Sequence, residues 1–226
     1  MDKLSFIKKL FYDASDKEIQ IINNLSSIIE LNYNNNSFKK EHNLTNYMYI
    51  VIEGFIKLYN KNKLESEFTI DILGPGDFFG EGAILDIELY QFHTFFGEAK
   101  LLKIDFKEMQ ENMFKDCPML SNFIFTESLN RIRKITQRMC ILLEESEVKV
   151  AKSIIFLANI YGTRENGYIK FSFPGQKEFA LFANCSRETV SRILNKFVSL
   201  NLIEYDRRKF TEIIIKDYGS FLNHYN

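Results

Sequence analysis

Apolar residues recur along the chain with two different periods, and the first change of period falls near residue 28. Within residues 1–30 the period is helical, with one apolar stripe at Phe6, Ile7, Leu10 and Phe11 and another at Ile19, Ile22 and Leu25. From about residue 28 to residue 104, short runs rich in Tyr, Ile, Val and Phe, such as YMYIVIEGFIKLYN, are separated by Gly or Asn turns. Short strands of this kind predict a compact antiparallel β-barrel or roll.

A long helix without internal proline is predicted over residues 119–143. Six of its positions are four or three residues apart in alternation and five of the six are apolar, which is the spacing of a coiled-coil seam. The helix could instead pack as a single amphipathic helix on its own domain. Its length, and its place between two regions of different composition, favour a homodimer. The predicted dimer seam consists of Phe125, Leu129, Ile132, Thr136, Met139 and Leu143.

The last part of the chain predicts a winged helix-turn-helix. The pattern gives a helix over 148–160, a strand over 168–173, a short helix over 176–183, a second helix over 186–200 and two closing strands around residues 206–209. The expected fold class is therefore α+β, with an N-terminal antiparallel β-roll, a long dimerisation helix and a C-terminal winged helix-turn-helix. The expected domains are residues 1–116, 117–143 and 144–226.

The stretch NCSRETVSRILNKF, residues 184–197, predicts a helix that reads DNA bases. Ser186 is placed to cap the helix, because its hydroxyl can accept from the amide of the second or third residue of the first turn. The apolar positions face the core, which leaves Arg187, Glu188 and Arg192 on the outside. Arginine offers forked donors to guanine, and glutamate can accept from cytosine. A solvated face with ordinary charges is the alternative.

Composition and charge place any nucleic-acid contact in the second half of the chain. The 226 residues carry a net charge of −1, but residues 144–226 hold 12 Lys+Arg against 10 Asp+Glu, while residues 1–143 hold 17 against 20. All eight arginines lie at or after Arg131. A codon bias toward lysine would lower arginine everywhere and would not confine it to one end. No apolar run is long enough to cross a bilayer and no secretory signal is evident, so the cytoplasm is the expected compartment.

These motifs resemble the CRP/FNR family of bacterial transcription regulators over the full chain. CSRETVSRIL is similar to the family's recognition helix, most of all in the catabolite-activator branch, and YIVIEGFIKLY and GPGDFFGEGAIL are similar to its β-roll. The resemblance implies a homodimer that binds double-stranded DNA at TGTGA-like half-sites and acts with RNA polymerase. Its implied base readers are Arg187, Glu188 and Arg192. Its implied phosphate contacts are Ser186, Thr189, Ser191 and Lys196.

The sequence departs from cyclic-AMP-binding members of the family in the β-roll. Those members carry an Arg-Ser pair, shortly after a Gly-Glu, that grips the cyclic phosphate. Here the Gly-Glu is present as Gly80-Glu81, but the Arg-Ser positions fall on Leu89 and Tyr90, and no arginine lies upstream to substitute. Burying a phosphate without a counter-charge is costly, so cyclic AMP is not expected as the effector. The expected effector pocket is lined by Gly80, Glu81, Leu89, Tyr90, Ile132 and Ile135.

The remaining cofactor chemistry is limited by the few histidines and cysteines. The three cysteines, at positions 117, 140 and 185, exclude a four-thiolate Fe–S cluster in the amino-terminal region. Haem could use His42 or His93, which keeps a haem-based NO or CO sensor as an alternative. An unidentified small apolar or acidic molecule, or no ligand, stays open as well. No metal site and no enzyme activity are expected, and the outward arginines argue against a ligand-binding module that does not bind DNA.

Overall fold

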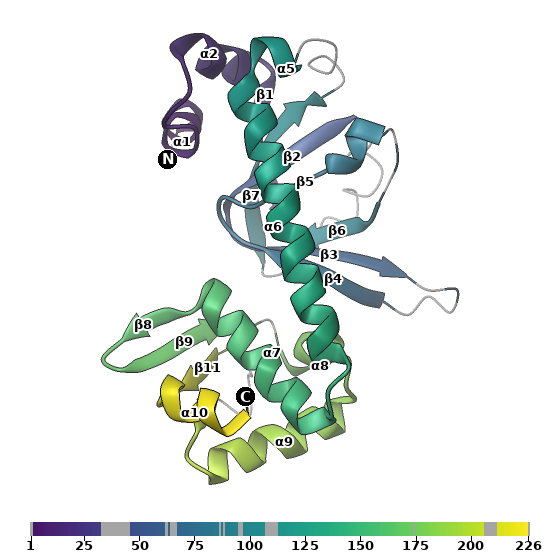
Figure 1. Ribbon diagram of the computed structural model, residues 1–226, viewed down its shortest axis with the longest axis vertical. Coiled ribbons are helices and arrows are strands. Elements are labelled where there is room, and N and C mark those ends of the chain that lie inside the picture. The colour runs from purple at the N-terminus through teal and green to yellow at the C-terminus, as the bar shows by residue number, and fades with distance from the viewer. Residues whose placement is uncertain are drawn as a thin grey trace. The chain divides into compact units, whose positions relative to one another are not determined.

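The computed structural model describes residues 2–32, 46–61, 63, 67–85, 87, 89–94, 97–106, 113–173, 175–205 and 212–225 (Figure 1). The chain forms two compact units, each of which combines two segments. The first unit comprises Met1–Asn60 and Ile70–Arg133, and the second comprises Lys61–Thr69 and Lys134–Asn226. The boundary between the units lies within the long helix that the sequence predicts, and the three domain limits expected from the sequence stay predictions.

The β-roll predicted for the first part of the chain is confirmed as two sheets, with strand orders β1-β7-β2-β5 and β4-β3-β6. Every strand pair whose register is described here is antiparallel. The sheets follow two short helices, α1 (Lys3–Leu10) and α2 (Asp16–Asn24). The strands are β1 (Ser26–Asn32), β2 (Tyr47–Glu53), β3 (Ile56–Lys61), β4 (Glu67–Leu73), β5 (Phe78–Phe79), β6 (Gln91–Thr94) and β7 (Glu98–Asp105).

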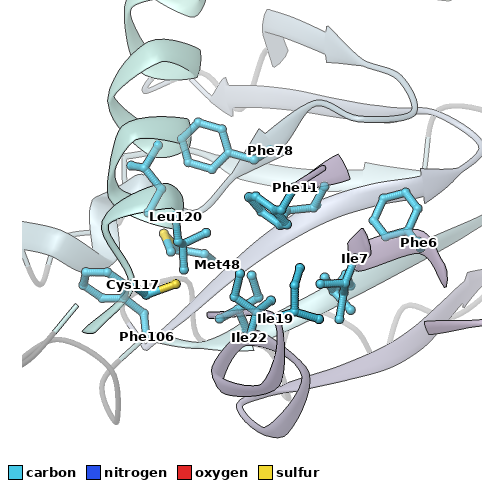
Figure 2. Close-up of a cluster of buried hydrophobic side chains, with 14 of the residues drawn as sticks. Phe6, Ile7, Phe11, Ile19, Ile22, Met48, Phe78, Phe106, Cys117 and Leu120 are labelled. Atoms are coloured by element: carbon cyan, nitrogen blue, oxygen red, sulfur yellow. The ribbon is translucent and has the colours of Figure 1, made fainter. Parts of the chain in front are cut away.

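Alternation along the strands divides the apolar side chains of the β-roll between two clusters. On β2, Met48 and Ile50 point into one cluster, and Tyr49 and Val51 point into the other. The first cluster also receives side chains from α1, α2 and the start of the long helix (Figure 2). The apolar stripes of residues 1–30 therefore pack into this core, with Leu10 and Leu25 partly buried.

The predicted long helix is α6 (Pro118–Leu142), which follows the short α5 (Met113–Asp116). Glu18 of α2 supports its first turn, because its carboxylate accepts from the Met119 amide at 2.9 Å. All six predicted seam positions are exposed in the chain, with exposed fractions of 64% at Phe125 and 61% at Ile132. Two arginines on other faces of α6, Arg131 and Arg138, are buried. Within the second unit, Arg138 donates to the carbonyl oxygens of Thr69 and Phe182.

The second unit contains the predicted winged helix-turn-helix. Its sheet has the strand order β10-β11-β9-β8. The two closing strands predicted around residues 206–209 are β10 and β11, and residues 206–209 themselves lie outside the described residues. Its elements are α7 (Ser146–Tyr161), β8 (Thr163–Glu165), β9 (Tyr168–Ser172), α8 (Gln176–Ala183), α9 (Arg187–Ser199), β10 (Ile203–Tyr205), β11 (Glu212–Ile215) and α10 (Tyr218–Tyr225).

The sequence analysis did not predict α10. Asp217 starts this helix by accepting from the Ser220 amide at 3.0 Å, and Phe221 and Tyr225 pack their rings against Phe197 of α9. Helix α10 therefore covers the core side of α9 near its carboxyl end.

Candidate DNA-binding helix and effector domain

The start of α9 is fixed by a tight turn and a side-chain cap. Helix α8 ends at Ala183 and is capped by Asn184, whose backbone is left-handed with φ 49° and ψ 51°. Ser186 then has extended backbone angles and accepts from the Thr189 amide at 3.1 Å. This is the cap that the sequence predicts, and its hydroxyl also lies 3.0 Å from the Thr189 hydroxyl. Two hydroxyls predicted to contact phosphates are thus held together at the helix start.

One face of α9 is buried and the opposite face is exposed. Val190, Leu194 and Phe197 are each 0% exposed, which anchors the helix in the core of its unit. The predicted base readers Arg187, Glu188 and Arg192 are all exposed. Among the described residues, no carboxylate lies within ion-pair distance of Arg187 or Arg192. Both guanidinium groups can therefore donate outside the protein.

Glu188 is held as an acceptor. Hydrogen bonds from its own backbone amide and from the Ser186 side chain lower the pKa of the Glu188 carboxyl, and the neighbouring Arg187 lowers it further. The side chain is therefore ionised at neutral pH and can accept hydrogen bonds but cannot donate them. The first turn of α9 consequently presents donors and an acceptor side by side.

Two other outward positions of α9 are engaged within the second unit. The Lys196 ammonium group lies 2.7 Å from both carboxylate oxygens of Glu147 on α7. Glu147 also accepts from the Tyr225 hydroxyl at 3.1 Å, and Asn195 accepts from Tyr205 at 3.1 Å. The phosphate contact implied for Lys196 stays a prediction, and in this structure the ammonium group is paired with a carboxylate. Ser191 is half-buried.

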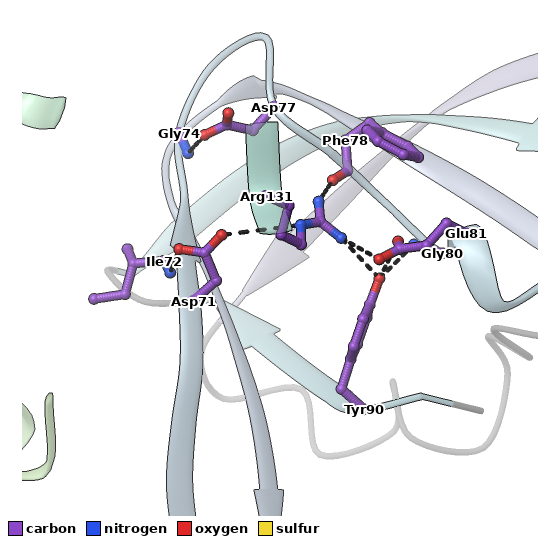
Figure 3. Close-up of polar contacts among 9 residues, drawn as sticks. All are labelled: Asp71, Ile72, Gly74, Asp77, Phe78, Gly80, Glu81, Tyr90 and Arg131. Carbon is purple, nitrogen blue, oxygen red and sulfur yellow. Dashed lines mark hydrogen bonds and ion pairs between the residues drawn. The ribbon is translucent and has the colours of Figure 1, made fainter. Parts of the chain in front are cut away.

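In the first unit, acceptor groups converge on the guanidinium group of Arg131 from α6 (Figure 3). One terminal nitrogen donates to Glu81 at 2.5 Å and to the Tyr90 hydroxyl at 3.2 Å. The other donates to the carbonyl oxygen of Phe78. The Nε atom lies 3.9 Å from an Asp71 carboxylate oxygen in a further ion pair. The guanidinium group is thus surrounded by two carboxylates, a hydroxyl and a carbonyl.

The turn at Gly80 places Glu81 and Tyr90 in this cluster. Gly80 has φ 95°, and a Cβ there would lie 2.5 Å from the Tyr47 carbonyl oxygen, so only glycine fits. Its amide donates to the Tyr90 hydroxyl at 2.9 Å, and that hydroxyl donates to Glu81. The short 3-10 helix η1 (Glu81–Leu85) begins at this point.

Burial and neighbouring groups shift the pKa values of Tyr90 and Arg131 in the cluster. The side chains of Arg131 and Asp71 are only 8% and 5% exposed, and that of Glu81 is 17% exposed. Burial raises the pKa of the Tyr90 hydroxyl far above its usual range, so the group is neutral. Burial alone would lower the pKa of the Arg131 guanidinium, but Tyr90, Glu81 and Asp71 outweigh it and raise that pKa. The guanidinium group is permanently charged.

The predicted effector pocket agrees only in part with this geometry. Gly80, Glu81 and Tyr90 are brought together, but Leu89 and Ile132 are 42% and 61% exposed. Ile132 points away from Arg131 because adjacent residues of a helix differ in direction by about 100°. The roles of Leu89 and Ile132 in an effector pocket stay predictions. Ile135 is half-buried and belongs to the second unit.

Arg131 itself was missed as a member of the cluster. No arginine lies upstream of the β-roll motifs, but Arg131, downstream of them on α6, reaches Glu81 and Tyr90. Its hydrogen-bond partners lie 41 to 53 residues away along the chain, and no local pattern marks that pairing.

Neither haem candidate has a described side chain. His42 lies outside the described residues, and only the backbone of His93 is described, in β6. In the described part of the chain, no three His, Cys, Asp or Glu side chains form a possible metal site. Its helices also include none with the length and apolar character needed to span a membrane. All three cysteines are free thiols.

Comparisons with known proteins match both halves of this architecture. Residues 37–116 match the family model of the cyclic nucleotide-binding domain, and residues 148–221 match that of the Crp-like helix-turn-helix domain. The chain is 26% identical over 173 residues to the CRP-like cAMP-activated global transcriptional regulator of Mycobacterium tuberculosis, covering 75% of each chain. It is 27% identical over 149 residues to the cyclic AMP receptor protein of Thermus thermophilus, covering 66% of each chain.

A solved structure supports the same fold. The cyclic nucleotide-binding domain containing protein from Listeria monocytogenes superposes with a TM-score of 0.71 at 15% identity, covering 95% of this chain and 98% of that one. At this identity the likeness shows a shared fold.

Proposed function

Because the chain belongs to the CRP/FNR family of bacterial transcription regulators, we propose that it binds a palindromic DNA site as a homodimer and reads TGTGA-like half-sites. The observation that carries the proposal is the first turn of α9, where Arg187 and Glu188 are exposed on a capped helix. A major groove admits one such helix, which reads bases with its N-terminal residues.

The chemistry of the three readers fits guanine and cytosine edges. Arg187 and Arg192 can each donate two parallel hydrogen bonds to the two acceptor atoms of a guanine. The ionised Glu188 can accept a hydrogen bond from a cytosine amino group. Ser186 and Thr189 lie where hydroxyls at a helix N-terminus can contact a phosphate.

Dimerisation is supported by the exposed apolar stripe of α6. A stripe at alternating spacings of four and three residues is the pattern by which two helices pack together. Two copies joined there would present two recognition helices to half-sites about 34 Å apart. The protein would act in the cytoplasm, and contact with RNA polymerase stays a prediction from the family.

A binding assay on Arg187→Ala tests this function. We expect the wild type to prefer a TGTGA palindrome over a scrambled duplex, and the variant to lose about 1–3 kcal/mol of discrimination at one guanine. Fluorescence anisotropy with duplexes substituted one base pair at a time measures both effects at fixed salt.

Lys8→Ala is the matched control, since it removes an exposed positive charge from α1 in the other unit. Its base preferences should equal those of the wild type. An equal loss of affinity for every duplex in Arg187→Ala would make that residue a phosphate contact only. A wild type without preference for any palindrome would refute the proposed function.

A further inference from the structure

We propose that Arg138 is a positioning residue for DNA recognition, because it holds the carboxyl end of α8 and, through it, the start of α9. The proposal rests on the proposed function, since it concerns how the base readers are placed. The contacts that carry it lie within the second unit, which contains the end of α6, the start of β4 and the helix-turn-helix.

The last turn of α8 is largely buried and has no cation of its own. Ala180, Phe182 and Ala183 are 3%, 2% and 0% exposed, and the sequence of this turn, ALFA, contains no basic residue. An α-helix leaves its last carbonyl oxygens without partners inside the helix, and water has little access to them here. A buried carbonyl without a partner is costly, so these oxygens need donors from elsewhere in the fold.

Backbone amides and Arg138 supply these donors. The Ala180 carbonyl oxygen accepts from the amides of Asn184 and Cys185. The Phe182 carbonyl oxygen accepts from a terminal nitrogen of Arg138 at 3.0 Å. A cation at the carboxyl end of a helix also interacts favourably with the helix dipole. Arg138 therefore caps α8 from a different helix.

Further partners fix the guanidinium group of Arg138 in this place. The other terminal nitrogen donates to the carbonyl oxygen of Thr69 in β4. The guanidinium carbon lies 4.3 Å from the centre of the Phe182 ring and 5.5 Å from that of the Phe68 ring. A planar guanidinium group can donate hydrogen bonds in its plane and stack on rings through its faces, so one side chain serves all of these partners.

The carboxyl end of α8 determines where α9 begins, because only three residues separate the two helices. Asn184 is left-handed at one end of this turn, and Ser186 caps α9 at the other. A displacement of the end of α8 would therefore move the first turn of α9, which carries Arg187 and Glu188. Hydrogen bonds to base edges weaken steeply when their geometry changes, so this placement affects base reading.

The base preference of Arg138→Gln tests the proposal. The measured quantity is the ratio of affinities for the TGTGA palindrome and for a scrambled duplex, from fluorescence anisotropy at fixed salt. We expect the ratio to fall about tenfold, the effect of one misaligned base contact. A mere loss of folded protein would lower both affinities together and leave the ratio unchanged.

Arg133→Gln is the matched control, because Arg133 is an exposed arginine on the same helix, and it should keep the wild-type ratio. A folded Arg138→Gln with the wild-type ratio would overturn the proposal.

Hydrogen exchange tests the cap without DNA. The amides of Asn184 and Cys185 should exchange faster in Arg138→Gln than in the wild type or in Arg133→Gln, because the end of α8 opens more readily. Unchanged exchange at these two amides would overturn the proposal. If the wild type shows no preference for the palindrome, the proposed function fails, whereas faster exchange in Arg138→Gln would still show that Arg138 caps α8.

A second variant covers the case in which Arg138→Gln does not fold. Phe68 is 46% exposed, so Phe68→Leu removes a ring partner of Arg138 with little change to the core. We expect exchange at the Asn184 and Cys185 amides to speed up about twofold to fivefold, the size of an exposed cation–π contact. Exchange at the wild-type rate would show that the guanidinium group is not held there, which would overturn the proposal.

Discussion

The ammonium group of Lys196 lies on the outward face of α9 but is held by Glu147 of α7, at 2.7 Å from each carboxylate oxygen. A lysine that contacts a phosphate contributes about 0.9 to the slope of log affinity against log salt concentration. Because the ion pair already neutralises Lys196, we expect Lys196→Ala to leave this slope nearly unchanged. DNA-binding titrations at several salt concentrations measure this slope.

The same substitution tests what the ion pair contributes to stability. The Lys196 side chain is 52% exposed, so solvent screens the pair and its loss should cost about 0.2–1 kcal/mol in urea unfolding. Glu147→Gln serves as the partner variant, since it frees Lys196 without removing its charge. A steeper slope of log affinity against log salt concentration in Glu147→Gln, together with a shallower slope in Lys196→Ala, would show that Lys196 contacts a phosphate.

At the scale of the element, Glu18 connects the starts of two helices. Its carboxylate accepts from Met119 in the first turn of α6, and it forms a capping box with Ser15 at the start of α2. Hydrogen bonds from the Met119 amide, and then from the Ser15 amide and hydroxyl, lower the pKa of Glu18 from 4.5. Because the folded value is the lower one, the stabilisation is present above pH 4.5 and is lost as the pH falls through the folded value.

We therefore expect Glu18→Gln to lower the free energy of unfolding by about 0.5–1.5 kcal/mol at neutral pH, because glutamine has one acceptor oxygen where the carboxylate accepts through two. The difference from the wild type should shrink in acid, where the wild-type carboxyl is protonated. Urea unfolding at a series of pH values measures this. Asp16→Asn, which neutralises an exposed acid in the same first turn of α2, is the control. An equal difference at every pH would assign the effect to packing rather than to charge.

Apart from α10 and the short α5, the helices that depend on neighbouring residues could be predicted from the sequence, whereas contacts between distant residues could not. The helices over 176–183 and around 187–199 follow from local periodicity. The Ser186 cap was also predictable, because the amide from which its hydroxyl accepts belongs to Thr189, only three residues along the chain. By contrast, Arg131 meets Glu81 across 50 residues, and Lys196 meets Glu147 across 49. Lysine and arginine usually occupy exposed helix positions. The residue types at positions 131 and 196 therefore did not indicate that Arg131 is buried or that Lys196 is paired with a carboxylate.

At the scale of the whole molecule, the seam of α6 leaves apolar area on the surface that a second copy would cover. Leu129 is 51% exposed and Met139 is 61% exposed. Burying one such side chain contributes about 1.5–3 kcal/mol, and in a homodimer each position counts twice. Leu129→Glu would lose this burial in both copies and bring two carboxylates together, so we expect dimer affinity to fall by about a hundredfold or more.

Sedimentation velocity across a concentration series measures this change, and DNA binding reports its consequence. A palindrome requires two recognition helices held in fixed register, so a monomeric Leu129→Glu should lose most of its preference for two half-sites over one. Leu4→Glu is the matched control, because Leu4 is 41% exposed on α1 outside the seam, and it should remain dimeric with normal operator preference. A Leu129→Glu protein that sediments as a dimer would place the two-fold contact on another surface, and the outward face of α6 would then need a different partner.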